Sequence, residues 1–269
     1  MCTARVDELI GQAADRLVDA STRRVAAAPV RDIIGADDIE AAYAVQQELT
    51  HRRLAAGAQV VGRKIGLTSP PVQRQLGVVQ PDFGVLFAEM DVSNHTVVPS
   101  HRLLQPKVEA EIAFVLKHDL RDMSASGEDV SAAVDYAVAA LEIVDSRIAD
   151  WDIAITDTIA DNASSAMFVL SEKRLLLSEF SPREVSMQMY ADGALVSRGS
   201  GSLCLGDPLK ALAWLARTAA EFGDPLRAGQ IVLSGALGPM LAVSPGVSVH
   251  ADLGPLGTVS ATFSSTEVS

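Results

Sequence analysis

The sequence predicts an α+β protein in which a helical N-terminal segment precedes a β-rich body. Apolar residues recur at helical spacing as far as Gly57. From Pro106 onward the apolar runs are short and are separated by turn residues, which is typical of strands. The one plausible domain boundary lies between Gly57 and Pro106. We therefore divide the chain into a segment 1–80, which includes the first strand, and a body 81–269. No disordered linker separates the two parts, and we expect them to form one integrated unit.

Two amphipathic helices are expected at the start of the chain. The first spans Arg5–Arg24, and its apolar residues at helical spacing are Val6, Leu9, Ile10, Ala13, Leu17 and Val18. The second follows the acidic pair Asp37 and Asp38, ends at Gly57, and has the apolar residues Ile39, Ala42, Val45, Leu49 and Leu54. Residues 67–77 (LTSPPVQRQLG) are expected to form a loop with a short helix.

Short apolar runs rich in β-branched residues predict the strands. These runs are residues 59–67, 107–116, 139–148, 166–170, 184–199, 230–235, 247–252 and 258–263. Residues 187–199 within the run 184–199 should be a hairpin, because Asp192 and Gly193 form a dipeptide favoured in tight two-residue turns. Two helices are predicted between strands, one around Gly127–Ala140 and one at Pro208–Phe222 with Asp207 as its N-cap.

Composition narrows the class of protein. The 269 residues are 48% hydrophobic, which is enough for a sizeable core, and the formal net charge is -12. No basic stripe is present, so we expect no nucleic-acid partner. Cys2 and Cys204 are too few and too far apart for a disulfide framework, which indicates a reducing compartment. Neither a signal peptide nor a long apolar run is evident, and we expect a cytoplasmic protein with no membrane span.

Two acids stand two positions apart in the predicted strand 107–116. Glu109 and Glu111 therefore project from one face of this strand, while apolar residues occupy the other. A third acid, Glu142, lies in the otherwise apolar run 139–148. Carboxylates in buried strands are costly unless a cation compensates them, and three that leave coordination positions open suit Mg²⁺ or Mn²⁺. The alternative is an ordinary half-exposed strand whose glutamates face water.

Lys64 and Asp82 are further candidates for chemistry. Lys64 lies in the apolar run 59–67, where its ammonium group would hold a substrate carboxylate or stabilise an enolate. The alternative is a surface lysine whose stem lies along apolar neighbours. Asp82 directly follows Pro81, and a turn residue is its ordinary interpretation, with an acid–base role as the alternative.

Five ordered motifs show a resemblance to a known family. They are GRKIGLTSPPVQRQLGVVQPDFGVLF, LQPKVEAEIAFVL, LEIVDSRIADW, DTIADNASS and IVLSGALGPM. In this order they resemble the 2-hydroxypenta-2,4-dienoate (2-keto-4-pentenoate) hydratases of aromatic meta-cleavage pathways. These enzymes belong with the 4-oxalocrotonate decarboxylases in the wider fumarylacetoacetate hydrolase superfamily. The resemblance runs from about Arg31 to Ser264, and the conjunction of motifs is far more specific than any one of them.

The resemblance implies a roll-like catalytic body of the fumarylacetoacetate hydrolase type. It also implies a divalent ion, Mg²⁺ or Mn²⁺, and an active site in named roles. The implied metal ligands are Glu109, Glu111 and Glu142, the implied catalytic residues are Lys64 and Asp82, and the implied substrate contact is Ser164. Homo-oligomers, as pentamers or decamers, and a pathway decarboxylase or aldolase are the implied partners. The chain departs from the family's frequent Gly-His-Pro, because Asp207 stands where the histidine would be.

The resemblance implies a lyase that adds water to 2-hydroxypenta-2,4-dienoate to give 4-hydroxy-2-oxopentanoate. The metal would stabilise the charge on the 2-oxygen, water would add at carbon 4 and a proton at carbon 3. Three other functions stay open. They are a 4-oxalocrotonate decarboxylase, an acylpyruvate-type C–C bond hydrolase, and a non-catalytic scaffold subunit.

Overall fold

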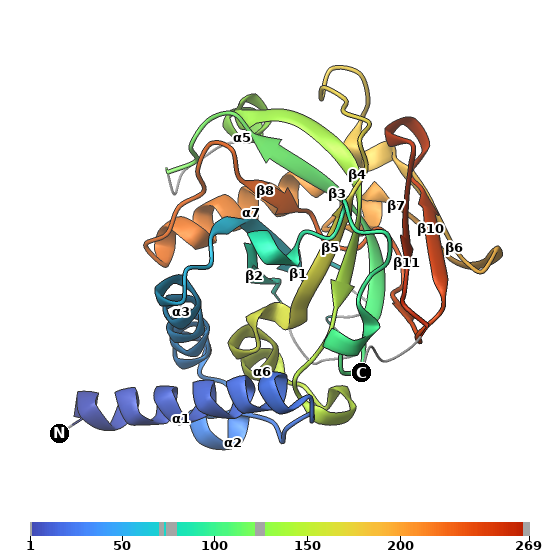
Figure 1. The fold of residues 1–269 in the computed structure, drawn as a ribbon. Coiled ribbons are helices and arrows are strands. Elements are labelled where there is room, and N and C mark those ends of the chain that lie inside the picture. The colour runs from blue at the N-terminus through green and yellow to red at the C-terminus, as the bar shows by residue number, and fades with distance from the viewer. Residues whose placement is uncertain (1, 70–72, 74–79, 122–126, 266–269) are drawn as a thin grey trace.

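The computed structural model describes residues 2–69, 73, 80–121 and 127–265, and it confirms the α+β class (Figure 1). Within these residues the helices are α1 (Cys2–Arg23), α2 (Arg31–Ile34), α3 (Ile39–Ala55), α5 (Gly127–Ala133), α6 (Ile155–Ala160) and α7 (Pro208–Glu221). The strands are β1 (Val60–Gly66), β2 (Asp82–Phe87), β3 (Lys107–Leu116), β4 (Val134–Val144), β5 (Ser165–Leu170), β6 (Ser186–Ala191), β7 (Ala194–Ser200), β8 (Ile231–Leu233), β9 (Leu241–Ala242), β10 (Ser248–Asp252) and β11 (Thr258–Thr262).

Two sheets form the β-rich body. In the larger one the strand order is β2-β1-β8-β3-β4-β5, and β9 also pairs with β3. Strands β1 and β8 run parallel, whereas β3 pairs antiparallel with β4, β8 and β9. The smaller sheet has the order β11-β10-β6-β7, and Figure 1 shows it standing beside the larger one. Because β1 lies between β2 and β8, the first strand of the chain is an inner strand of the larger sheet.

Strand β3 is buried on both faces. One face carries Ile112 and Phe114, which belong to the same apolar cluster as Val249 and Ala261 of the smaller sheet. The other face carries the two glutamates and then Ala113, which packs in a second cluster with residues of β2, β4, β5 and β8. A strand covered on both sides has no water-facing row, so any charge on it lies inside the protein.

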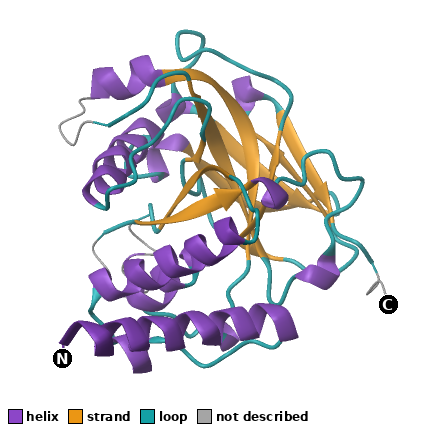
Figure 2. Cartoon of the chain, turned by 60° about the vertical axis from the view of Figure 1, so that its left-hand side comes forward, coloured by secondary structure: helices purple, strands orange, loops and turns teal. Residues whose placement is uncertain are grey.

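The N-terminal helices lie at one end of the sheets. Figure 2 shows the long first helix running along the molecule's edge below the strands, and α3 contacts both α1 and α6. On α3, the buried Gln46 side chain donates hydrogen bonds to the carbonyls of Phe83 and Ile159, both at 2.9 Å. Arg31 donates to the buried Asp157 carboxylate of α6 at 2.6 Å. These bonds fix α6, which reaches the site described below. No helix of the described residues is long and apolar enough to cross a bilayer.

Several sequence-based expectations are confirmed. The two N-terminal helices, the hairpin and the helix after Asp207 are present. The turn residues Asp192 and Gly193 both have positive φ, at 48° and 81°, as a type I′ turn requires. The Asp207 side chain accepts a hydrogen bond from the backbone N–H of Leu209 at 2.9 Å, which is an N-cap bond.

Two expectations about secondary structure are wrong, and a third concerns residues outside those that the structure describes. The helix predicted for Gly127–Ala140 ends at Ala133, because the following residues pair with β3 over its whole length and begin β4. Backbone bonds to a buried strand outweigh the local helical spacing there. Residues 82–87 form β2, although no strand was predicted for them. The short helix expected in residues 67–77 falls mainly on residues 70–72 and 74–79, outside the described residues.

Candidate active site

Three carboxylates converge inside the larger sheet. Glu109 of β3 lies directly opposite Glu142 of β4, and Glu111 is two residues further along the same face of β3. One oxygen of each lies within 4.8 Å of the others. Glu109 is 8% exposed, and the other two are 0% exposed. The alternative of glutamates that face water is therefore excluded. Like charges opposite each other on a buried sheet destabilise it unless something positive lies between them.

The surroundings leave oxygen atoms free for a cation. Lys64 Nζ lies 3.3 Å from Glu142 Oε1, and the Gly235 N–H donates to Glu111 Oε2 at 2.8 Å. Among the described residues, no group donates a hydrogen bond to Glu111 Oε1 or to either oxygen of Glu142. One ammonium cannot neutralise three carboxylates. An all-oxygen set with uncommitted acceptor atoms fits Mg²⁺ or Mn²⁺.

Burial raises the pKa values of these acids, and repulsion from neighbouring acids adds to this for Glu109 and Glu111. Burial raises the pKa of Glu109 to about 7, and the Lys64 charge only partly opposes this. Burial, followed by the charges of Glu142 and Glu109, raises the pKa of Glu111 well above its usual range. Burial also raises the pKa of Glu142, against the effect of Lys64. The acids in turn stabilise the protonated form of the lysine. Burial alone would lower the pKa of Lys64, but the charges of the surrounding acids raise this pKa overall.

Asp82 and Lys64 lie side by side on the neighbouring strands β2 and β1. In the β1–β2 pairing, Gly66 faces Asp82 and Lys64 faces Gly84. A Cβ at Gly66 would lie 2.1 Å from Asp82 Oδ1 and 3.5 Å from Lys64 Nζ, so the missing side chain provides the space that the aspartate occupies. Asp82 is 1% exposed and lies at the start of a strand. Its interpretation as a turn residue is therefore wrong. The surface interpretation of Lys64 is wrong as well, because it is 2% exposed.

Thr158 of α6 holds the Asp82 carboxylate in place. Its hydroxyl donates to Asp82 Oδ2 at 2.9 Å, while Oδ1 accepts no hydrogen bond from a described residue. Burial raises the pKa of Asp82, and the Lys64 charge and the Thr158 bond oppose this. An aspartate with a raised pKa and one uncommitted oxygen is suited to moving a proton.

A cavity of about 530 Å³ opens against these groups. Its polar lining residues are Lys64, Thr68, Ser69, Asp82, Lys107, Glu109, Thr158 and Ser164. Leu67, Ile153 and Met240 belong to its apolar wall. Its size and mixed lining are those of a small-molecule site. The structure thus brings Lys64, Asp82 and Ser164 to one cavity, together with Glu109 of the carboxylate cluster.

The segment that carries Ser164 is held in an unusual conformation. Asn162, Ala163 and Ser164 have φ values of 55°, 50° and 53°, a region that non-glycine residues rarely occupy. The Asn162 side chain exchanges two hydrogen bonds with the backbone of Val85 on β2, at 2.7 and 2.9 Å. The Ser164 hydroxyl donates to Asp161. Strained backbone held by such bonds clusters at binding sites.

Sequence reasoning missed four residues of this site. Thr158 and Gly235 contact the predicted acids, and Lys107 and Trp151 line the cavity, with the Lys107 ammonium 3.9 Å from the Trp151 ring centre. The glycine carries the one local signal: its φ is 101°, and a Cβ there would lie 2.4 Å from Thr68. The other three carry no signal that distinguishes them from ordinary surface or capping residues.

The comparisons with known proteins agree with this geometry. The family model for the fumarylacetoacetate (FAA) hydrolase C-terminal domain matches residues 69–264. The chain is 52% identical to the TodF product hydratase of Pseudomonas putida F1, over 94% of this chain and 95% of the relative. It is 50% identical to the 2-keto-4-pentenoate hydratase of Paraburkholderia phymatum, over 96% of this chain and 98% of the relative.

Solved structures of the same fold contain metals. The 4-oxalocrotonate decarboxylase of Pseudomonas putida G7, complexed with magnesium and adipate, superposes with a TM-score of 0.91 at 33% identity, covering 96% of this chain and 97% of the other. The fumarylpyruvate hydrolase of Pseudomonas aeruginosa, in complex with Mn²⁺ and pyruvate, gives 0.61 at 16% identity, covering 75% and 88%, and shows a shared fold alone. The chain therefore belongs to the fumarylacetoacetate hydrolase family, and within it to the 2-keto-4-pentenoate hydratases.

Proposed function

We propose that this protein is a metal-dependent hydro-lyase that converts 2-hydroxypenta-2,4-dienoate into 4-hydroxy-2-oxopentanoate. The observation that carries this is the buried cluster of three carboxylates and one ammonium, of which Lys64 and Glu109 line the cavity. Such a cluster is suited to a 2-oxo acid. Relatives that are 50% and 51% identical in sequence are named 2-keto-4-pentenoate hydratases, and this supports the choice of substrate. The cavity and its buried charges disfavour a pure scaffold role.

The position of each residue suggests a separate role in the reaction. Glu109, Glu111 and Glu142 would hold a divalent ion, which supplies Lewis-acid stabilisation of the charge on the substrate's 2-oxygen when bound. Lys64 keeps its proton among these acids, so its ammonium offers a fixed positive charge to the substrate carboxylate or enolate. Asp82, held by Thr158 at one oxygen, would move protons with the other. The apolar wall limits the entry of bulk water.

The same proposal extends to the protein's cellular location, assembly and partner enzymes. We propose a cytoplasmic homo-oligomer, a pentamer or decamer, that works beside a pathway decarboxylase or aldolase. The family resemblance supports the assembly, and the acidic composition with two cysteines supports the compartment. The 4-oxalocrotonate decarboxylase remains a second candidate, because a decarboxylase shares the fold at 33% identity. Lower identity to hydrolases of this fold makes C–C bond hydrolysis the weaker alternative.

The metal-loaded protein is expected to consume freshly generated 2-hydroxypenta-2,4-dienoate. The measurement is loss of dienoate absorbance together with appearance of 4-hydroxy-2-oxopentanoate. 4-Oxalocrotonate, with carbon dioxide release as the readout, tests the decarboxylase, and acylpyruvate cleavage tests the hydrolase. Carbon dioxide release without hydration would replace the hydratase proposal with the decarboxylase. Turnover by the isolated protein would exclude a pure scaffold.

Replacing Glu111 by Gln should weaken metal binding while the fold persists. The amide keeps the shape but removes the charge from one ligand, so the Mn²⁺ concentration for half-maximal activity should rise at least about tenfold. Glu128→Gln, an exposed acid in the first turn of α5, is the matched control. A titration by activity and by calorimetry checks both variants. An unchanged metal dependence in Glu111→Gln would remove the proposed metal site.

Replacing Lys64 by Ala should lower kcat by about 100-fold or more, because a fixed charge near the reacting oxygen is lost. Circular dichroism should show a retained fold. Lys210→Ala, which removes an exposed lysine on α7, should turn over normally. Steady-state kinetics on the dienoate give the comparison. A Lys64→Ala rate close to that of the unchanged protein would discard its catalytic role.

Metal affinity should rise as pH rises through about 7. Burial raises the pKa of Glu109 to about 7 and also that of Glu111, so at lower pH an incoming ion must displace protons. Each displaced proton costs about tenfold in affinity per pH unit below the pKa. Calorimetric Mn²⁺ titrations between about pH 6 and about pH 8, in buffers of different ionisation enthalpy, count the released protons. Binding that releases none and ignores pH would contradict this.

A further inference from the structure

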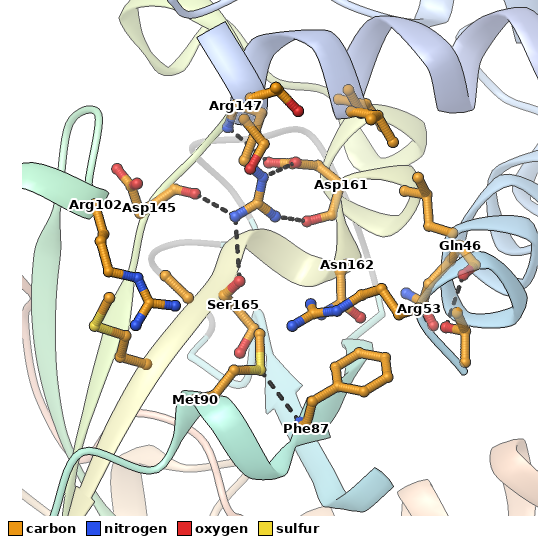
Figure 3. A pocket seen from close by; sticks show the side chains of 18 of the residues that line it. Gln46, Arg53, Phe87, Met90, Arg102, Asp145, Arg147, Asp161, Asn162 and Ser165 are labelled. Carbon is orange, nitrogen blue, oxygen red and sulfur yellow. Dashed lines mark hydrogen bonds and ion pairs between the residues drawn. The ribbon is translucent and has the colours of Figure 1, made fainter. Parts of the chain in front are cut away.

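A second cavity, of about 500 Å³, is lined by Asp161, Asn162 and Ser165, whereas Ala163 and Ser164 of the same segment line the active-site cavity. Figure 3 shows its interior. Helices α1 and α3, the stretch after β2, residues 102–104 and the start of β5 contribute to its lining. None of the residues proposed for metal binding or catalysis lines this second cavity. The proposed hydratase reaction therefore leaves it without a role.

Two arginines enter this cavity from opposite sides. Figure 3 shows the guanidinium groups of Arg53 and Arg102 on either side of Ser165. Arg53 donates to Glu89 at 2.6 Å and lies 3.8 Å above the centre of the Phe87 ring. No side-chain hydrogen bond joins Arg102 to another described residue, and its charge acts on Glu89, the acid that Arg53 binds. Two like charges that face one space repel each other, and an anion between them removes that cost.

The other charged residues of the lining are already paired. Arg147 binds Asp161, and its Nη1 also donates to the carbonyl of Asp145 at 2.7 Å. The Asp145 carboxylate accepts the backbone N–H groups of Leu104 and Gln105. Arg52 pairs with two acids outside the cavity, Asp15 and Glu48. The charge left to bind a ligand is therefore positive, in a protein whose formal net charge is -12.

Apolar side chains make up much of the remaining lining, beside the uncharged polar residues Ser21, Thr22, Gln46, Thr50, Asn162 and Ser165. Its apolar side chains include Leu17, Leu49, Phe87, Met90, Leu103 and Met167. An apolar floor with a guanidinium stacked on an aromatic ring suits a flat, apolar body that carries one carboxylate, since guanidinium binds carboxylate with two parallel hydrogen bonds. The volume is that of a site for a small organic molecule.

We infer that this cavity is a second ligand site, distinct from the proposed active site, for a small organic carboxylate with a flat apolar body. Arg102 and Arg53 bind its carboxylate, and Phe87, Met90 and Met167 contact its body. Ser165 lines this cavity, and its hydroxyl approaches the Glu142 carboxylate without the geometry of a hydrogen bond.

Calorimetric titration of the full-length, metal-loaded protein with benzoate tests this inference without use of the hydratase reaction. Benzoate should bind, whereas benzamide, which has the same shape without the charge, should bind at least about tenfold more weakly. Arg102→Gln and Arg53→Gln should each weaken benzoate binding at least about tenfold. Arg121→Gln, an exposed arginine that pairs with Asp119, is the matched control and should bind normally. Lys64→Ala should also bind normally, because its cavity is the other one.

Other outcomes would overturn the inference. Equal benzoate affinity in Arg102→Gln and in the unchanged protein would show that the arginine pair does not bind it. Loss of binding in Lys64→Ala alone would assign the benzoate to the active-site cavity. No benzoate binding, together with a smaller assembly of Arg102→Gln in light scattering, would show that a carboxylate of a second copy occupies the cavity. Circular dichroism establishes that each variant is folded.

Discussion

The burial of three carboxylates and one ammonium within a sheet is the constraint on which the rest of the site depends. Each ion taken out of water costs several kcal/mol, and like charges add repulsion to that cost. Lys64 compensates one acid, so a doubly charged cation is the natural partner of the other two. The cluster then contributes little stability without its ion. Its value lies in chemistry, because the same desolvation strengthens every electrostatic contact with a bound keto acid.

The fold supplies the walls that keep these charges dry. Both faces of β3 are covered, and the helices α3 and α6 close the end where Asp82 lies. Hydrogen bonds from Gln46 and Arg31 fix these helices, and Thr158 of α6 donates to the aspartate. The left-handed turn before β5 belongs to the same wall. It faces the active-site cavity with Ser164 and the second cavity with Asn162. One short segment therefore separates two cavities of similar size.

A good part of the fold and the site could be predicted from the sequence. Helical spacing located the N-terminal helices, and the period of two placed Glu109 and Glu111 on one face. The ordered motifs led to the family before any coordinates. Helix propensity failed at residues 134–140, because pairing with β3 is a long-range interaction that the local pattern does not contain. For the same reason β2 was missed, although all its residues are buried.

By itself, the sequence determined which residue types are present and how they are spaced along each strand. This was enough to name the acids, the lysine and Asp82 as candidates. Only the tertiary structure decided that β3 and β4 align Glu109 with Glu142, and that Gly66 leaves room for Asp82 beside Lys64. It alone showed the roles of Thr158 and Gly235 and the second cavity. Strand register, burial and cavities arise from contacts between residues far apart in the chain, and spacing along the chain does not contain them.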